Sequence, residues 1–472
     1  MKLNRFFMLG LAGLAFAACS NEDNPAVGGD GSNKTMVVSV AGIGAGTTKA
    51  AGPVDKWTPD ANAGAAVTNI NSLSLLFTDA NGVIKYKYEG NKTDAADEWN
   101  ALFSTAGVKF VGLTGVTQVH AIANVPSGVD VPDVNDNISD LRTISYQLQG
   151  LGESATKAGV VYLGSDVDIT PLMQEPATAT EEVKLPGAGD EGNFYYTAAI
   201  KLVPIVSRIQ INNITIETSG STTFPEQAVG SITANKFTLK WSNFKPTLHG
   251  VYLNNFASAF NGFAGTVGAM LKNDSFVNTV KDGQWLLSST NYADDAAYVS
   301  YAASDYGTLL TYGTEDAGKT PLTIDAGKCL AFNVFVPFDP ATGNATTIAN
   351  PTIHFQFAKD VTGYTTEFKL TDGDAEVTDP ADKEFIATAS TALSYKLPTL
   401  NTGYLFANVS KLLTAESGST QVTLAPGKIY NMDVTISPVN MTIDFDNPKS
   451  YNVVVTVTVV QFTEENIYPG LD

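Results

Sequence analysis

The chain has 472 residues, of which 44% are hydrophobic, and a formal net charge of -20. A chain of this length normally forms two or three domains, and we expect two. The negative charge and the presence of only three arginines argue against nucleic acid or anionic lipid as a partner, because both require a basic surface.

The N-terminal segment has the features of an export signal. Lys2 and Arg5 precede an apolar run from Phe6 to Ala18, which is too short to span a bilayer comfortably. No later stretch reaches the roughly 18 consecutive apolar residues that a membrane helix needs. The run ends at Cys19, one of two cysteines in the chain.

Leu14-Ala15-Phe16-Ala17-Ala18-Cys19 resembles a bacterial lipoprotein signal, with Phe16 where Leu or Val is usual. The resemblance implies that residues 1–18 are removed and that Cys19 is acylated. An ordinary secretory signal, with Cys19 incidental, is the alternative. Ser20-Asn21-Glu22-Asp23 resembles the acidic signal that directs lipoproteins of the Bacteroidetes to the outer face of the outer membrane.

The segment after Cys19 is expected to form a tether, one strand and a loop. Ser20 to Lys34 is rich in Gly, Asn and Asp, which predicts a disordered tether. Thr35 to Ile43 then has a strand pattern, and Gly44 to Pro53 is a loop of small residues that contains Lys49. Exposed loops of this kind are where proteases cut.

Strand signals recur through the rest of the chain. Short runs rich in Val, Ile, Thr, Phe and Tyr alternate with Gly, Asn, Asp and Pro turns, which predicts an all-β fold of β-sandwiches. The clearest runs are Asn69 to Phe77, Gln118 to Ala123, Ala199 to Ile216, Phe237 to Trp241, Cys329 to Val336, Ile353 to Phe357 and Val453 to Phe462. Helical turns are expected only near Ala95 to Phe103 and Tyr404 to Leu413. The polar run Glu217 to Thr223 predicts a boundary between domains 50–222 and 223–472.

The residue types that carry catalysis are sparse. His120, His249 and His354 are scattered without metal-ligand spacing, and we expect them to have structural roles. Cys329 lies in an apolar run and is expected to be a buried hydrophobic residue. Thr371 to Asp379 is oxygen-rich but lacks EF-hand spacing, so a solvated turn is expected. We expect no enzymatic activity, no metal and no cofactor.

The C-terminal end carries an unusual strand signal. Tyr451 to Phe462 could form one strand of about 40 Å, long for a globular domain. Val453, Val455, Val457 and Val459 share one face of it. An unpaired apolar strand at a chain terminus is an aggregation hazard unless a partner groove receives it.

In their order along the chain, several motifs resemble the fimbrillins, the shaft subunits of the type V pili of Bacteroidales. They are Asn69-Ile70-Asn71-Ser72-Leu73-Ser74-Leu75-Leu76-Phe77-Thr78-Asp79-Ala80-Asn81-Gly82, Val119-His120-Ala121-Ile122-Ala123-Asn124-Val125-Pro126, Lys201-Leu202-Val203-Pro204-Ile205-Val206-Ser207-Arg208-Ile209-Gln210-Ile211, Gly250-Val251-Tyr252-Leu253-Asn254-Asn255 and Leu424-Ala425-Pro426-Gly427-Lys428-Ile429-Tyr430-Asn431-Met432-Asp433-Val434-Thr435-Ile436. The resemblance covers nearly the whole chain.

The resemblance implies two transthyretin-like sandwiches that assemble by strand exchange. A trypsin-like protease would cut between Lys49 and Ala50 and remove the lipidated propeptide 19–49. The displaced strand Thr35 to Ile43 presents Met36, Val38, Val40 and Ile43. The donor strand of another copy, Tyr451 to Phe462, would insert through Tyr451, Val453, Val455, Val457, Val459 and Phe462. The other partners that the resemblance implies are fimbrial anchor and tip subunits. It also implies a location on the cell surface and a role in adhesion and biofilm formation.

Three alternatives stay open at this point. Lys34 and Lys56 are other possible cut sites, since the best-known relatives are cut after Arg and this chain has none between Arg5 and Arg142. The chain could be a tip or accessory subunit of the fimbria. It could also be a glycan-binding surface lipoprotein with immunoglobulin-like domains, which would present exposed aromatic platforms such as Trp57, Trp99, Trp241 or Trp285.

Overall fold

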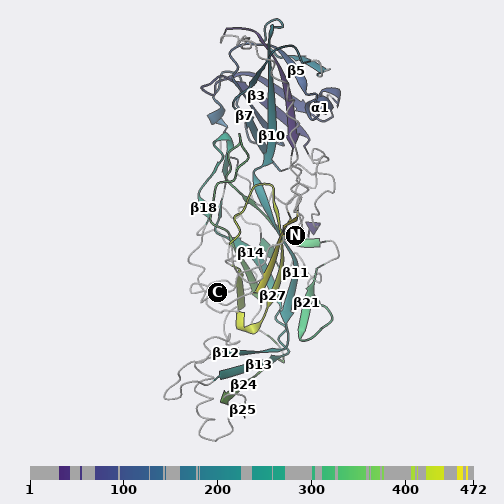
Figure 1. Ribbon diagram of the computed structural model, residues 1–472. Coiled ribbons are helices and arrows are strands. Elements are labelled where there is room, and N and C mark those ends of the chain that lie inside the picture. The colour runs from purple at the N-terminus through teal and green to yellow at the C-terminus, as the bar shows by residue number, and fades with distance from the viewer. Residues whose placement is uncertain are drawn as a thin grey trace, which may run out of the picture.

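The computed structural model describes most of the β-rich body of the chain. The residues described are 31–42, 54–55, 70–93, 96–126, 128–141, 144, 160–176, 179, 181–224, 236–257, 259–271, 300–302, 311–324, 328–357, 361, 363–372, 375–376, 405–409, 412, 421–440, 454–460 and 464–465. These residues form an elongated molecule with three β-rich bodies stacked end to end (Figure 1). Within the described part, no helix is long and apolar enough to cross a membrane.

The first body is a nine-stranded sheet with the order β4-β3-β6-β7-β10-β1-β5-β9, and β8 also pairs with β10. Its strands are β1 (Lys34–Gly42), β3 (Ser72–Thr78), β4 (Ile84–Asn91), β5 (Val108–Leu113), β6 (Gln118–Ala123), β7 (Tyr162–Asp166), β8 (Thr170–Leu172), β9 (Glu181–Lys184) and β10 (Phe194–Pro204). Helix α1 (Ala96–Leu102) packs on this sheet through Trp99 and Leu102.

The middle body contains an eight-stranded sheet and a four-stranded sheet. The eight-stranded sheet runs β2-β22-β11-β27-β28-β29, and β21 joins β11 to β20. Its strands are β2 (Val54–Asp55), β11 (Val206–Glu217), β20 (Thr311–Tyr312), β21 (Lys319–Thr323), β22 (Lys328–Phe335), β27 (Ile429–Ile436), β28 (Val454–Val460) and β29 (Glu464–Glu465). The four-stranded sheet has the order β19-β14-β23-β26, from β14 (Leu248–Asn254), β19 (Ser300–Ala302), β23 (Thr352–Phe357) and β26 (Leu405–Val409).

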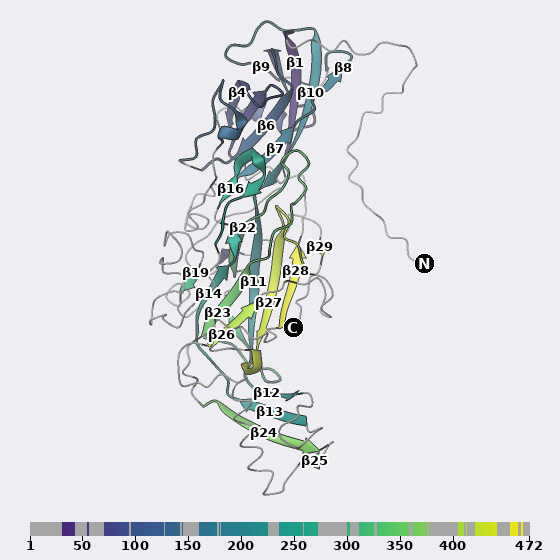
Figure 2. The same cartoon turned by 90° about the vertical axis from the view of Figure 1, so that its left-hand side faces the viewer.

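The third body and two short hairpins complete the described strands. A four-stranded sheet, β12-β13-β24-β25, lies at the far end of the molecule (Figure 2). It is made of β12 (Gly220–Phe224), β13 (Lys236–Ser242), β24 (Thr365–Asp372) and β25 (Ala375–Glu376). The hairpins pair β15 (Phe256–Ala257) with β18 (Met270–Leu271) and β16 (Phe260–Asn261) with β17 (Thr266–Val267). Short 3-10 turns span Ile138–Asp140, Gly262–Ala264 and Pro438–Asn440.

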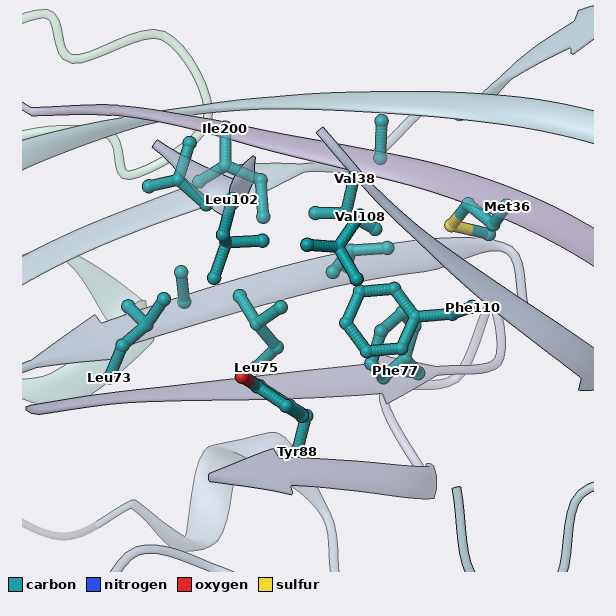
Figure 3. Packing of buried hydrophobic residues seen from close by; sticks show 14 of the residues in the cluster. Met36, Val38, Leu73, Leu75, Phe77, Tyr88, Leu102, Val108, Phe110 and Ile200 are labelled. Carbon is teal, nitrogen blue, oxygen red and sulfur yellow. The ribbon is translucent and has the colours of Figure 1, made fainter. Parts of the chain in front are cut away.

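Alternation along the strands explains the core of the first body. In β4 the side chains of Ile84, Tyr86 and Tyr88 are buried, and the residues between them lie nearer the solvent. Such period-two patterns place one face of each strand on the core. Figure 3 shows side chains from β1, β3, β4, β5, β10 and α1 meeting in that core.

The first and middle bodies join where β10 passes into β11. Pro204 ends β10 because proline has no amide hydrogen to give to the ladder. Ile205 then bridges the bodies, since its amide donates to the Val161 carbonyl at 3.1 Å and its carbonyl accepts from the Val336 amide at 3.1 Å. A second apolar cluster surrounds this junction, with members from both bodies such as Leu163 and Phe335.

The all-β class is confirmed, and so is the helical turn at 96–102. The second expected helical turn was wrong, because 405–409 is strand β26, which pairs with β23 over five residues. Pairing with a neighbouring strand outweighs local preference there. The run from Ala199 to Ile216 is divided between two strands. The chain passes from the first sheet to the eight-stranded sheet at Ile205, before the domain boundary expected after Thr222. The division into two transthyretin-like domains stays a prediction.

Candidate strand-exchange site

Strand β1 lies inside the first sheet rather than at its edge (Figure 2). All nine residues from Lys34 to Gly42 pair in parallel with β10, from Phe194 to Leu202. On its other side, β1 pairs antiparallel with β5. Strand β1 therefore fills a slot whose two walls are β10 and β5.

The inner face of β1 belongs to the main core. Met36 and Val38 are fully buried and Val40 is 3% exposed. In Figure 3, Met36 and Val38 extend from β1 toward Phe110 and Val108 of β5. Removing β1 would thus open an apolar groove in the sheet, with unpaired backbone groups on both walls.

The N-terminal end of β1 is held by polar contacts. Lys34 is 4% exposed, its ammonium donates to the Val116 carbonyl at 2.8 Å, and it lies 5.0 Å from the centre of the Tyr196 ring. The Thr35 hydroxyl donates to the Gly192 carbonyl at 3.1 Å. Lys34, expected in a disordered tether, is in fact the first residue of the strand.

An ion-pair cluster lies over the β5 side of the same slot. The Lys109 ammonium is 2.7 Å from Glu182, 3.0 Å from Glu175 and 3.1 Å from Glu191. Glu182 in β9, followed by the other two carboxylates, raises the pKa of Lys109 above its ordinary value. Because Glu175 follows β8 and Glu191 precedes β10, the cluster links β5 to chain segments next to β8 and β10.

The chain next enters the described part at β2. There Val54 and Asp55 pair with Cys329 and Lys328 of β22, so β1 and β2 belong to different sheets. Lys49, Ala50 and Ile43 lie between them, outside the described residues, as does Cys19.

Strand β28 lies near the edge of the eight-stranded sheet. Its seven residues pair antiparallel with β27, and its other side pairs only with the two-residue β29 within the described part. Val455, Val457 and Val459 lie opposite Val434, Met432 and Tyr430. Tyr451, Val453 and Phe462 lie outside the described residues. The structure thus brings β28 next to β27 and does not bring it near β1 in the same molecule (Figure 2).

Other residues singled out in the sequence have ordinary structural surroundings. His120 is 6% exposed, with Nδ1 2.8 Å from the Ser165 hydroxyl and Nε2 3.3 Å from the Thr78 hydroxyl. It borders an open hollow of about 530 Å³ between the first and middle bodies. Cys329 is fully buried, as expected. Among the described residues, no three His, Cys, Asp or Glu side chains are grouped to hold a metal ion.

Sequence reasoning missed the polar groups around β1. The Lys34 ammonium, the Gly192 carbonyl and the Lys109 ammonium come from distant parts of the chain, and no local pattern joins them. The one available signal was Lys34 immediately before the alternating apolar run of β1.

No protein-family model and no curated protein matches the chain. Among solved structures, it aligns with three fimbrial proteins of Porphyromonas gingivalis. The fimbrilin FimA is 13% identical, with 94% of this chain and 99% of that chain covered and a TM-score of 0.39. The tip fimbrial protein Mfa3 is 11% identical, with 91% and 99% covered and a TM-score of 0.31. The fimbrial anchor protein Mfa2 is 8% identical, with 92% and 100% covered and a TM-score of 0.31. At TM-scores this low, the function proposed below rests on the strand order of this chain.

Proposed function

We propose that the chain is a structural subunit of a cell-surface fimbria that assembles by donor-strand exchange and supports adhesion and biofilm formation. Its precursor is anchored to the outer membrane through acylated Cys19. The observation that carries this proposal is the position of β1, an interior strand of the first sheet that precedes the expected protease loop.

The attachment of β1 to its own chain delays assembly until it is cut. A tethered strand has an effective concentration at its own slot of about millimolar or more, so a strand from another molecule cannot compete. Cleavage removes this advantage. A replacement strand regains about 1 kcal/mol for each backbone hydrogen bond and more for each buried apolar side chain.

The burial of Lys34 favours a cut beyond β1. A protease needs exposed chain, and Lys34 is inside the sheet at 4% exposure. Lys49 and Lys56 remain as sites. A cut after Lys49 leaves β2 with the mature subunit, whereas a cut after Lys56 removes it, and we propose the cut at Lys49.

The positions of β1 and β28 favour a shaft subunit. The molecule combines a slot that can be vacated with a terminal strand that pairs broadly on one side only. A donor contact of this kind is heterologous and does not close, so its product is a filament of copies of this chain, with anchor and tip subunits at its ends. A tip subunit would need only one of the two features.

The glycan-binding alternative receives less support. It needs exposed aromatic platforms, yet Trp99 and Trp241 are 3% and 5% exposed, and the Trp241 indole donates to the Glu217 carbonyl at 2.9 Å. Trp57 and Trp285 lie outside the described residues.

The test is the N-terminus and assembly state of the protein sheared from its native cells. We expect a chain that begins at Ala50 and runs as an SDS-resistant ladder. A monomer that still begins at acylated Cys19 would contradict the proposal and favour an anchor or a glycan-binding lipoprotein.

A further inference from the structure

Lys34 occupies a cation-binding pocket at one end of the β1 slot. The Lys34 ammonium donates to the Val116 carbonyl at 2.8 Å and lies 5.0 Å from the Tyr196 ring centre, and the residue is almost wholly buried. A carbonyl oxygen and the face of an aromatic ring both attract a cation. Loss of β1 would empty this pocket together with the apolar groove.

The C-terminal sequence repeats the side-chain order of β1. Lys34-Thr35-Met36-Val37-Val38-Ser39-Val40 can be aligned with Lys449-Ser450-Tyr451-Asn452-Val453-Val454-Val455. The inner positions then match as Lys with Lys, Met with Tyr, and Val with Val twice. The hydroxyl that Thr35 directs to Gly192 is matched by that of Ser450.

We propose that Lys449 of a second copy occupies the pocket vacated by Lys34 and so fixes the register of the donor strand. This inference rests on the proposed strand exchange and adds its specificity-determining residue. Because side chains alternate, only slips of two residues keep the apolar face inward. Such a slip would place the ammonium of Lys449 in the apolar core or leave the pocket without a cation, and both are costly.

Among the described strands, two others have a lysine followed by large apolar residues at every second position, and their places in the sheet exclude them as donors. Lys328 begins β22, and Lys428 precedes β27. Strand β22 lies between β2 and β11, and β27 lies between β11 and β28, so both are interior strands. By contrast, the outer side of β28 pairs only with the two-residue β29 within the described part.

The register can be read by cysteine cross-linking in the full-length precursor. In β1, Val37 lies opposite Thr197 of β10, so Asn452 of the donor should occupy that place. Adjacent strands bring facing residues within disulfide range. Thr197→Cys is combined in turn with Ser450→Cys, Asn452→Cys or Val454→Cys, and each precursor is cleaved and allowed to assemble under mild oxidation.

We expect a boiling-resistant, reducible ladder from the Asn452→Cys pair, and little from the other two pairs. A ladder from Ser450→Cys or Val454→Cys instead would overturn the register while leaving strand exchange intact. Filaments without any of these cross-links would overturn the register and show that these positions of the donor do not face Thr197. A complete absence of filaments from the unmodified cleaved chain would overturn the proposed function as well.

A charge variant tests the lysine itself. Lys449→Met keeps the length of the side chain but removes the ammonium, so the strand should dissociate roughly 10- to 100-fold faster. Lys449→Arg should retain most of the stability. Lys240→Met, at an exposed position of β13 in another sheet, is the matched control and should leave dissociation unchanged. Equal dissociation rates for Lys449→Met and the control would overturn the inference.

Discussion

His120 is a buried side chain whose protonation affects the whole fold. Burial lowers its pKa from the usual 6.5 to about 4, so the ring is neutral in the folded protein at neutral pH. The unfolded chain binds a proton to this residue below about pH 6.5. Between those two values the unfolded state holds more protons, and stability therefore falls as the pH decreases.

We predict that this residue alone costs the precursor about 1 kcal/mol of unfolding free energy for each pH unit below 6.5, down to about pH 4. His120→Gln stays neutral throughout and should lack this contribution. Urea unfolding at pH 7.5, 6.0 and 5.0 measures the difference between the two proteins. The same pH dependence in both would show that His120 titrates normally in the fold.

Gly192 allows the closest approach of the chain to the start of β1. A Cβ atom at this position would lie 1.8 Å from the Asn33 carbonyl oxygen, which is backbone and cannot move aside easily. We predict that Gly192→Ala destabilises the precursor by about 2 kcal/mol, the usual scale of overpacking. Gly31→Ala is the control, because nothing lies within 4 Å of its Cβ. Thermal unfolding of the two variants should differ clearly, and equal midpoints would contradict the seating of β1 at Gly192.

At the scale of elements, β1 is part of the core of the precursor but not of the proposed mature subunit. Val38→Ala should lower the unfolding free energy of the precursor by about 2 kcal/mol, because it leaves a cavity beside Phe110 and Val108. The sheared filament should resist SDS and heat as the unmodified filament does, since β1 has been removed. A filament weakened by Val38→Ala would mean that β1 stays in place.

Alternation in the sequence predicted elements better than it predicted neighbours. It located β6 at Gln118–Ala123 with its true bounds, because the run is short, apolar and flanked by turns. It could not show that β1 lies between β10 and β5, since period two assigns a face to each side chain but no partner strand. It also missed the break at Ile205, which depends on hydrogen bonds to Val161 and Val336 from distant segments.

The candidate site was also predictable only in part. The alternation in the sequence predicted that Met36, Val38 and Val40 share one buried face of β1. The pocket around Lys34 could not be predicted, because Val116, between β5 and β6, and Tyr196, in β10, are distant from Lys34 in the sequence.

At the scale of the whole molecule, deletion of residues 451–472 separates folding from assembly. We predict that this variant keeps the first body intact, because within the described residues β28 and β29 pair only with strands of the middle sheet. It should be exported and cleaved but form no filaments. Electron microscopy of the cell surface measures the loss, and limited proteolysis of the first body serves as its control. Filaments formed by the deletion variant would show that another segment is the donor.

The direct passage from β10 into β11 has a mechanical meaning. The two strands are joined through Ile205 alone and run along the length of the molecule (Figure 2). In a fimbria assembled as proposed, a donor strand in the place of β1 would lie parallel to β10 from Phe194 to Leu202. A pull along the filament would then load those hydrogen bonds together in shear, instead of peeling them apart one by one. Such a joint holds best in the direction in which an adhering cell would be dragged.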